Sequence, residues 1–315
     1  MKKTLLLIPA MLFGVIGCGN GTNSNEPSYA YGLKILAPTG APALALYNLA
    51  NESRETFETT TNPKEGLLPM FIKGNYDVIV APTQGGLMQI VKQHAEYKIA
   101  ATITFGNFYI YSCGTDADQT LNDGDKVLIF QAEDLPGKIF NYCYGGLNLT
   151  INDVPGADDT KLVIGDNGMY DGVQYDYVFT AEPVLSALNK TAFIDVQENF
   201  KTKSDGLLLT QASVFIKNGI NENSAKSFLS SLKTSIELAI SNPSAMSSKI
   251  ASIGNDLEQK DRFGVTAAIA KRAMENSNSI GIGYTTAFEI KDDIQNFVNA
   301  IAPAIGTLDE EVFYK

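Results

Sequence analysis

The segment Asp77-Val78-Ile79-Val80-Ala81-Pro82-Thr83-Gln84-Gly85-Gly86 joins a strand to the turn that ends it. Residues 77–81 are almost all apolar and rich in valine and isoleucine, which is typical of a strand buried on both faces. Residues 82–86 contain turn formers, and apolar residues return at helical spacing from Leu87. A buried strand, a short turn and a helix in this order predict an α/β protein.

The same alternation continues on both sides of this segment. Further strands are predicted over residues 33–37, 56–60, 97–104, 126–131, 161–165 and 175–180, and helices over residues 41–50, 63–73 and 136–144. Residues 207–216 form a long extended run, and the chain beyond residue 221 is mainly helical. One apolar stripe in that part is expected to be core: Phe228, Leu229, Leu232, Ile236 and Ile240. The pattern and the length of 315 residues predict two lobes with mostly parallel wound sheets.

The N-terminus carries an export signal. Lys2 and Lys3 precede an uncharged, mostly apolar run over residues 4–17, which is shorter than the roughly 20 residues of a membrane-spanning helix. The run closes on Val15-Ile16-Gly17-Cys18, which has the pattern of a lipobox. We therefore expect a signal peptide at 1–17, a lipid on Cys18 and a polar, flexible tether over 18–29. This would place the mature protein on the extracytoplasmic face of the cell membrane.

Composition disfavours several functions. The chain has 24 Lys+Arg against 35 Asp+Glu, a formal charge of −11, so it repels nucleic acid. Its single histidine, His94, lies at the end of a predicted helix, which disfavours multi-histidine zinc sites and histidine-based catalysis. We expect no metal, no cofactor and no enzymatic activity. Cys113 and Cys143 are compatible with a disulfide bond or with two free thiols.

Four turns follow predicted strands, at residues 38–41, 82–86, 131–137 and 180–183. Ligands of wound α/β sheets gather outside the carboxyl ends of the strands, so these turns are the candidate binding loops. They carry Glu133, Asp134 and Glu182 and no arginine, which favours a small neutral or cationic ligand over an oxyanion. Alternatively, the carboxylates face solvent or cap helices.

Five features in this order resemble the ABC-importer substrate-binding lipoproteins of the type II periplasmic-binding-protein fold, the group with nitrate, sulfonate, taurine and thiamine-precursor binders. They are the lipobox at Cys18, Pro38-Thr39-Gly40, residues 77–83, Thr104-Phe105-Gly106 and the Ala-Glu-Pro that ends residues 175–183. The resemblance implies lobe 1 at 30–111 plus 212–315 and lobe 2 at 112–211. It also implies two crossover strands, near 109–113 and 209–214. The stretch 145–160 departs from the pattern.

This resemblance implies a solute trap that binds a small nutrient between the lobes. With the charge of the loops it predicts a neutral or cationic ligand, with an aromatic one among the candidates. Candidate ligand-binding residues are Thr39, Gly40, Ala41, Thr83, Gln84, Gly85, Phe105, Tyr109, Gln131, Glu133 and Glu182, with Tyr144 as a weaker stacking candidate. The expected partners are an ABC permease and its ATPase, with the binding protein itself a monomer. The alternative is a ligand-sensing or adhesive surface lipoprotein on the same fold that is not coupled to transport. An enzyme on this fold is disfavoured because the chain lacks the reactive histidines and cysteines that it would need.

Overall fold

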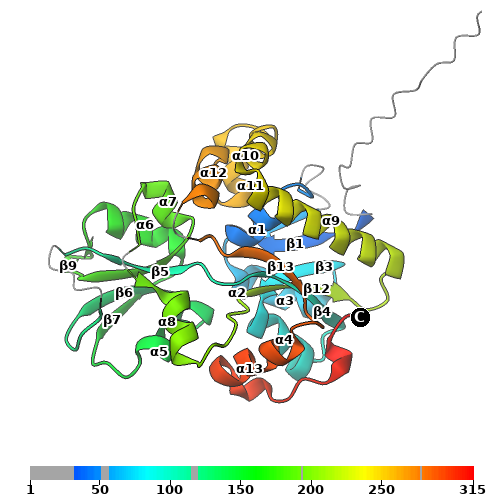
Figure 1. Cartoon of the computed structure of the whole chain (residues 1–315), viewed down its shortest axis with the longest axis horizontal. Coiled ribbons are helices and arrows are strands. Elements are labelled where there is room, and N and C mark those ends of the chain that lie inside the picture. Colours follow the sequence, from blue (N-terminus) through cyan, green and yellow to red (C-terminus); the bar gives the residue numbers. More distant parts are fainter. Residues whose placement is uncertain (1–31, 51–56, 115–119, 193, 277–278) are drawn as a thin grey trace, which may run out of the picture.

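The computed structural model describes residues 32–50, 57–114, 120–192, 194–276 and 279–315. The predicted signal peptide, Cys18 and the tether lie outside the described residues. The strands form two sheets, each with helices packed on it, which lie next to each other and form two lobes (Figure 1). The predicted α/β fold with two lobes is confirmed.

The first sheet has six strands, in the spatial order β13 (Ile282–Thr286), β4 (Tyr97–Thr104), β12 (Ala212–Lys217), β3 (Val78–Pro82), β1 (Ile35–Pro38) and β2 (Phe57–Thr60). Strands β2, β1 and β3 are parallel, whereas β12 runs antiparallel to both β3 and β4. Val78, Ile79 and Val80 have no exposed surface, as the unbroken apolar run of β3 predicts.

The helices of this lobe are α1 (Ala41–Ala45), α2 (Pro63–Gly66), α3 (Leu68–Lys73), α4 (Thr83–Gln93), α9 (Glu222–Ser241), α10 (Pro243–Ala251), α11 (Asp256–Phe263), α12 (Ala267–Glu275) and α13 (Lys291–Ile301), followed by 3-10 turns at Pro303–Ile305 and Glu310–Val312. The helix predicted over 63–73 is two helices, because Pro69 starts a new one. Four members of the predicted α9 stripe are buried, but Ile240 is 52% exposed.

The second sheet has five strands, in the order β11 (Ile194–Asp195), β5 (Phe108–Ser112), β10 (Tyr177–Ala181), β6 (Lys126–Phe130) and β7 (Thr150–Val154). Strands β10, β6 and β7 are parallel, and β5 is antiparallel to β10. This lobe also contains α5 (Leu135–Tyr144), α6 (Ala157–Gly165), α7 (Val184–Leu188), α8 (Val196–Lys203) and a small hairpin of β8 (Met169–Tyr170) with β9 (Val173–Gln174).

The strand predicted over residues 161–165 is wrong, because this segment belongs to helix α6. Asp159 Oδ2 accepts the Gly156 N–H at 2.9 Å and so caps the start of the helix. Val163 and Ile164 are buried while Leu162 is 75% exposed, a helical pattern of burial. The parallel strand of this region is β7, inside the stretch that departs from the family pattern.

The chain passes between the sheets at residues 105–107 and again at residues 207–211. Residues 109–112, predicted as part of a crossover, pair within the second sheet as β5, and the extended run over 207–216 becomes a strand only at Ala212. The Gln211 N–H donates to Thr104 O at 3.0 Å, which joins the two crossings. The lobe boundaries at 111 and 212 stay a prediction.

Cys113 and Cys143 are free thiols, so the disulfide alternative is not realised. Burial raises the pKa of Cys113 to about 11 and that of Cys143 to about 12. His94 ends α4 with a φ of 55°, at the helix end as the sequence predicts. Within the described part of the chain, every helix is too short or too polar to cross a bilayer.

Candidate functional site: the cleft between the lobes

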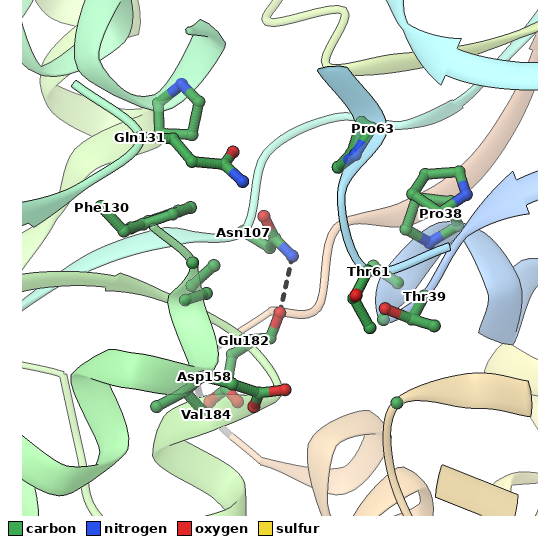
Figure 2. A pocket seen from close by; sticks show the side chains of 18 of the residues that line it. Pro38, Thr39, Thr61, Pro63, Asn107, Phe130, Gln131, Asp158, Glu182 and Val184 are labelled. Atoms are coloured by element: carbon green, nitrogen blue, oxygen red, sulfur yellow. Dashed lines mark hydrogen bonds between the residues drawn. The ribbon is translucent and has the colours of Figure 1, made fainter. Parts of the chain in front are cut away.

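A cleft of about 450 Å³ opens between the two sheets. Its first wall consists of residues 38–42 and 60–63, and its second of residues 130–131, 155–159 and 181–184. These segments begin at the carboxyl ends of β1, β2, β6, β7 and β10. Figure 2 shows Thr39 and Thr61 on one side and Phe130, Gln131, Asp158 and Glu182 on the other. The strand-end rule therefore locates the cleft correctly.

Five of the predicted binding residues line the cleft: Thr39, Gly40, Ala41, Gln131 and Glu182. The Thr39 N–H donates to Thr60 O at 3.0 Å, and the Gly40 N–H to Phe263 O at 2.9 Å. Both N–H groups therefore already have acceptors within the protein. Gly40 has a φ of 84°, a conformation that favours glycine.

The predicted binding turn at residues 82–86 contributes only Pro82 to the cleft lining. The Thr83 N–H donates to Gln211 O at 3.0 Å, and its hydroxyl lies 2.7 Å from Ser213 Oγ. Gln84 is only 8% exposed, and Gly85 packs near Leu68. Thr83, Gln84 and Gly85 are covered because β12 pairs with β3 as far as Pro82, and the incoming crossing covers the turn.

Phe105, Tyr109, Glu133 and the weaker candidate Tyr144 also lie outside the cleft lining. Tyr109 is 1% exposed and donates its hydroxyl to Ser279 O at 2.8 Å. Burial raises the pKa of Tyr109, and the nearby Asp195 and Glu182 carboxylates raise it further. Asn199 Nδ2 donates to the Tyr144 hydroxyl at 2.6 Å. The aromatic residues of the lining are instead Phe108 and Phe130.

Two lining residues at the crossings, Asn107 and Gln211, were not predicted. Asn107 is 4% exposed and its Nδ2 donates to Glu182 O at 2.7 Å, the dashed line in Figure 2. Gln211 Nε2 donates to Asn107 Oδ1 at 2.8 Å, and the Glu182 N–H donates to Asn107 O at 2.9 Å. These bonds tie both crossings to the turn after β10. No sequence motif marks Asn107 or Gln211. Residues 60–62 also line the cleft and were not predicted, although they lie at the end of a predicted strand and the strand-end rule could have found them.

Every charged side chain that the structure describes in the cleft lining is acidic. The lining contains Asp158, Asp159 and Glu182, and none of its described residues is lysine, arginine or histidine. Like the N–H groups of Thr39 and Gly40, the Gln131 N–H donates within the protein, to Val154 O at 3.0 Å.

Each carboxylate of the lining is already engaged within its own lobe. Glu182 Oε2 accepts the Ser186 N–H at 3.1 Å, Asp159 caps α6, and Asp158 Oδ1 lies 2.5 Å from Lys161 Nζ. The alternative of helix-capping carboxylates is thus realised for Glu182, and Asp159, which was not among the predicted carboxylates, also caps a helix; both remain in the cleft lining. The lining suits ligands that donate hydrogen bonds better than it suits oxyanions.

Comparison with solved structures finds the same architecture in transport proteins. An ABC transporter protein from Parabacteroides distasonis matches with a TM-score of 0.66 and 18% identity, over 90% of this chain and 98% of that one. The aliphatic sulphonate-binding protein SsuA from Escherichia coli matches with a TM-score of 0.61 and 13% identity, over 90% and 92%. The ligand-binding component of an ABC-type import system from Staphylococcus aureus, with zinc bound, gives 0.59 and 11%, over 90% and 96%.

No protein-family model matches the chain, and no curated protein matches it either. At these identities the likeness concerns the fold alone, and it extends over nearly all of the described residues. The two sheets, the double crossing and the cleft between them agree with that likeness. The chain has the two-lobed fold of the ABC-transporter periplasmic binding proteins.

Proposed function

We propose that this protein is the extracytoplasmic, lipid-anchored solute-binding component of an ABC importer. It captures a small neutral or cationic solute in the cleft and delivers it to a permease. The observation that carries the ligand class is the set of lining groups, which offers three carboxylates and no cationic side chain among its described residues. SsuA is described as a sulphonate binder, whereas the lining here holds carboxylates and no cationic side chain among its described residues, which disfavours a sulphonate.

The lobes are proposed to close on the ligand about the crossings at residues 105–107 and 207–211. Thr39 and Thr61 would contribute hydroxyl groups, Gln131 an amide, and Phe108 and Phe130 an apolar wall. Asp158 and Glu182 would favour a positive or N–H-bearing part of the ligand. Lobe 1 is proposed to span 30–111 plus 212–315, and lobe 2 to span 112–211.

A ligand screen tests the proposed ligand class. Native mass spectrometry of protein isolated from its own host identifies any retained solute, and thermal shift then compares amines and neutral heterocycles with nitrate and methanesulfonate. Thr61→Trp fills the exposed edge of the cleft, and Thr202→Trp on α8 is the matched control. We expect stabilisation by amines or neutral solutes that Thr61→Trp removes and the control keeps. Cleft binding of oxyanions alone would contradict the ligand class.

The lipid anchor and the link to transport need separate tests. Replacing Cys18 by serine should move the protein from the membrane to the soluble fraction and remove the acyl mass from its N-terminal peptide. Deletion of the gene should abolish uptake of the solute found by mass spectrometry, whereas a sensor or an adhesin would leave uptake unchanged. Light scattering of the purified protein should give the mass of a monomer.

A further inference from the structure

A second pocket, of about 360 Å³, lies between α7 of one lobe and α12 of the other. It is formed by residues 189–191, directly after α7, and by one face of α12. In Figure 1 these two helices face each other where the green and orange parts of the chain meet. Arg272 Nη1 donates to Ser186 O at 3.0 Å and Asn276 Nδ2 to Ser186 Oγ at 3.2 Å, so this pocket spans the two lobes.

The charges of this pocket are opposite to those of the cleft. It contains Lys190, Lys271 and Arg272 and a single acidic residue, Glu275. This concentration of cations is unusual in a chain with a formal charge of −11. Cationic side chains brought together from two lobes repel one another unless an anion lies between them.

The three cations keep donors that the protein does not use. Lys190 is half-buried, and its Nζ lies 5.6 Å from the centre of the Tyr111 ring, with no ion pair among the described residues. Lys271 Nζ lies 3.8 Å from Glu275 Oε1, too far for a hydrogen bond. Arg272 uses one N–H for Ser186 O, and its guanidinium carries others.

We propose that this pocket is a second ligand site, which binds a small multivalent oxyanion such as phosphate or sulfate and thereby holds the two lobes together. Lys190 from one lobe and Lys271 with Arg272 from the other would each donate to the same anion. Because the donors come from both lobes, the anion binds only where α7 and α12 lie close, and its binding stabilises that arrangement.

Calorimetry with inorganic phosphate tests the site directly. At constant ionic strength we expect a dissociation constant of about 1 mM or tighter, and binding at least tenfold weaker in Lys190→Met/Lys271→Met. The control Lys201→Met/Lys233→Met removes two exposed lysines from α8 and α9 and should bind as the wild type does. Amide exchange should slow in both α7 and α12 when phosphate is added. Absence of binding, or equal losses in both double variants, would overturn the proposal.

Two further outcomes are distinguishable. If the cations serve only to neutralise the carbonyl end of α7, Lys190→Met/Lys271→Met will lose the same stability in phosphate and in chloride, and the proposal fails. Thr61→Trp blocks the cleft and should leave phosphate binding intact. Loss of phosphate binding in Thr61→Trp would assign the anion to the cleft, which contradicts both this proposal and the proposed ligand class.

Discussion

The cleft and the pocket between α7 and α12 both lie between the lobes, but different kinds of groups form them. The cleft wall consists largely of turns at strand ends, in which the N–H groups of Thr39, Gly40 and Gln131 already donate within the protein, and its charge comes from carboxylates. The second pocket consists of long cationic side chains on a helix face and after a helix end. The comparison teaches that backbone-built turns form a rigid site, whereas surface side chains form one that mutation can remove without harming the fold.

The largest effect is expected for Gly137→Ala in the first turn of α5, where the Gly137 N–H donates to Gln131 O. A Cβ at this position would lie 1.8 Å from Ala132 O, so backbone must move. We expect a loss of about 3 kcal/mol or more in the free energy of unfolding, and loss of cleft binding. Chemical denaturation measures the first. Gly146→Ala, where a Cβ meets nothing within 4 Å, is the control. A native-like stability in Gly137→Ala would show that the cleft wall is pliable.

Asn107→Leu removes the side chain that joins the two crossings. Glu182 O and Gln211 Nε2 lose their partner in a buried place, at an expected cost of about 2 to 3 kcal/mol. Asn223→Leu, on the exposed side of α9, should change stability by less than about 0.5 kcal/mol. Urea unfolding of both variants measures the difference. Equal stabilities would mean that Asn107 does not support the cleft floor.

The ion pair at the cleft mouth should contribute little. Lys64 Nζ lies 4.0 Å from Asp134 Oδ1, and both side chains are exposed. Asp134→Asn should therefore change the free energy of unfolding by less than about 0.5 kcal/mol, and the change should vanish at high salt. Denaturation at low and high ionic strength measures both. A loss of unfolding free energy above about 1 kcal/mol that does not depend on salt would show that this surface ion pair stabilises the protein.

Cys113 reports on the charge of the second pocket. Burial and Asp176 raise its pKa to about 11, while Lys190 lowers it. Lys190→Met removes that positive charge, so the thiolate becomes rarer and alkylation by iodoacetamide at pH 8.5 should slow by about twofold. Labelling should rise with pH towards 11 in the wild type. Cys143, whose pKa burial raises to about 12 and whose nearby cation is Lys203 instead of Lys190, serves as the internal control. Faster labelling of Cys113 in Lys190→Met would contradict the assigned charge effect.

Part of the cleft could be predicted because strand ends can be read in the sequence. The turns after β1, β6 and β10 were predicted as binding loops and do line the cleft. Thr39, Gln131 and Glu182 lie in these turns, where the strand-end rule places them. The prediction that the turn after β3 is a binding loop was wrong for a reason outside the sequence of that turn. Strand β12 pairs with β3, and residue 211 accepts from Thr83, so segments from far along the chain cover the turn. The strand predicted over residues 161–165 was wrong because a short apolar run is compatible with either a strand or a helix.

By itself the sequence determined the α/β class, much of the alternation of strands and helices and the acidic character, because these depend on local periodicity and composition. The tertiary structure alone decided which N–H groups remain for a ligand, because a turn amide is taken by carbonyls such as Thr60 O and Phe263 O that lie far away in the sequence. It also decided that Lys190 and Arg272 line one pocket and that Arg272 donates to Ser186 O, since only folding brings α7 and α12 together.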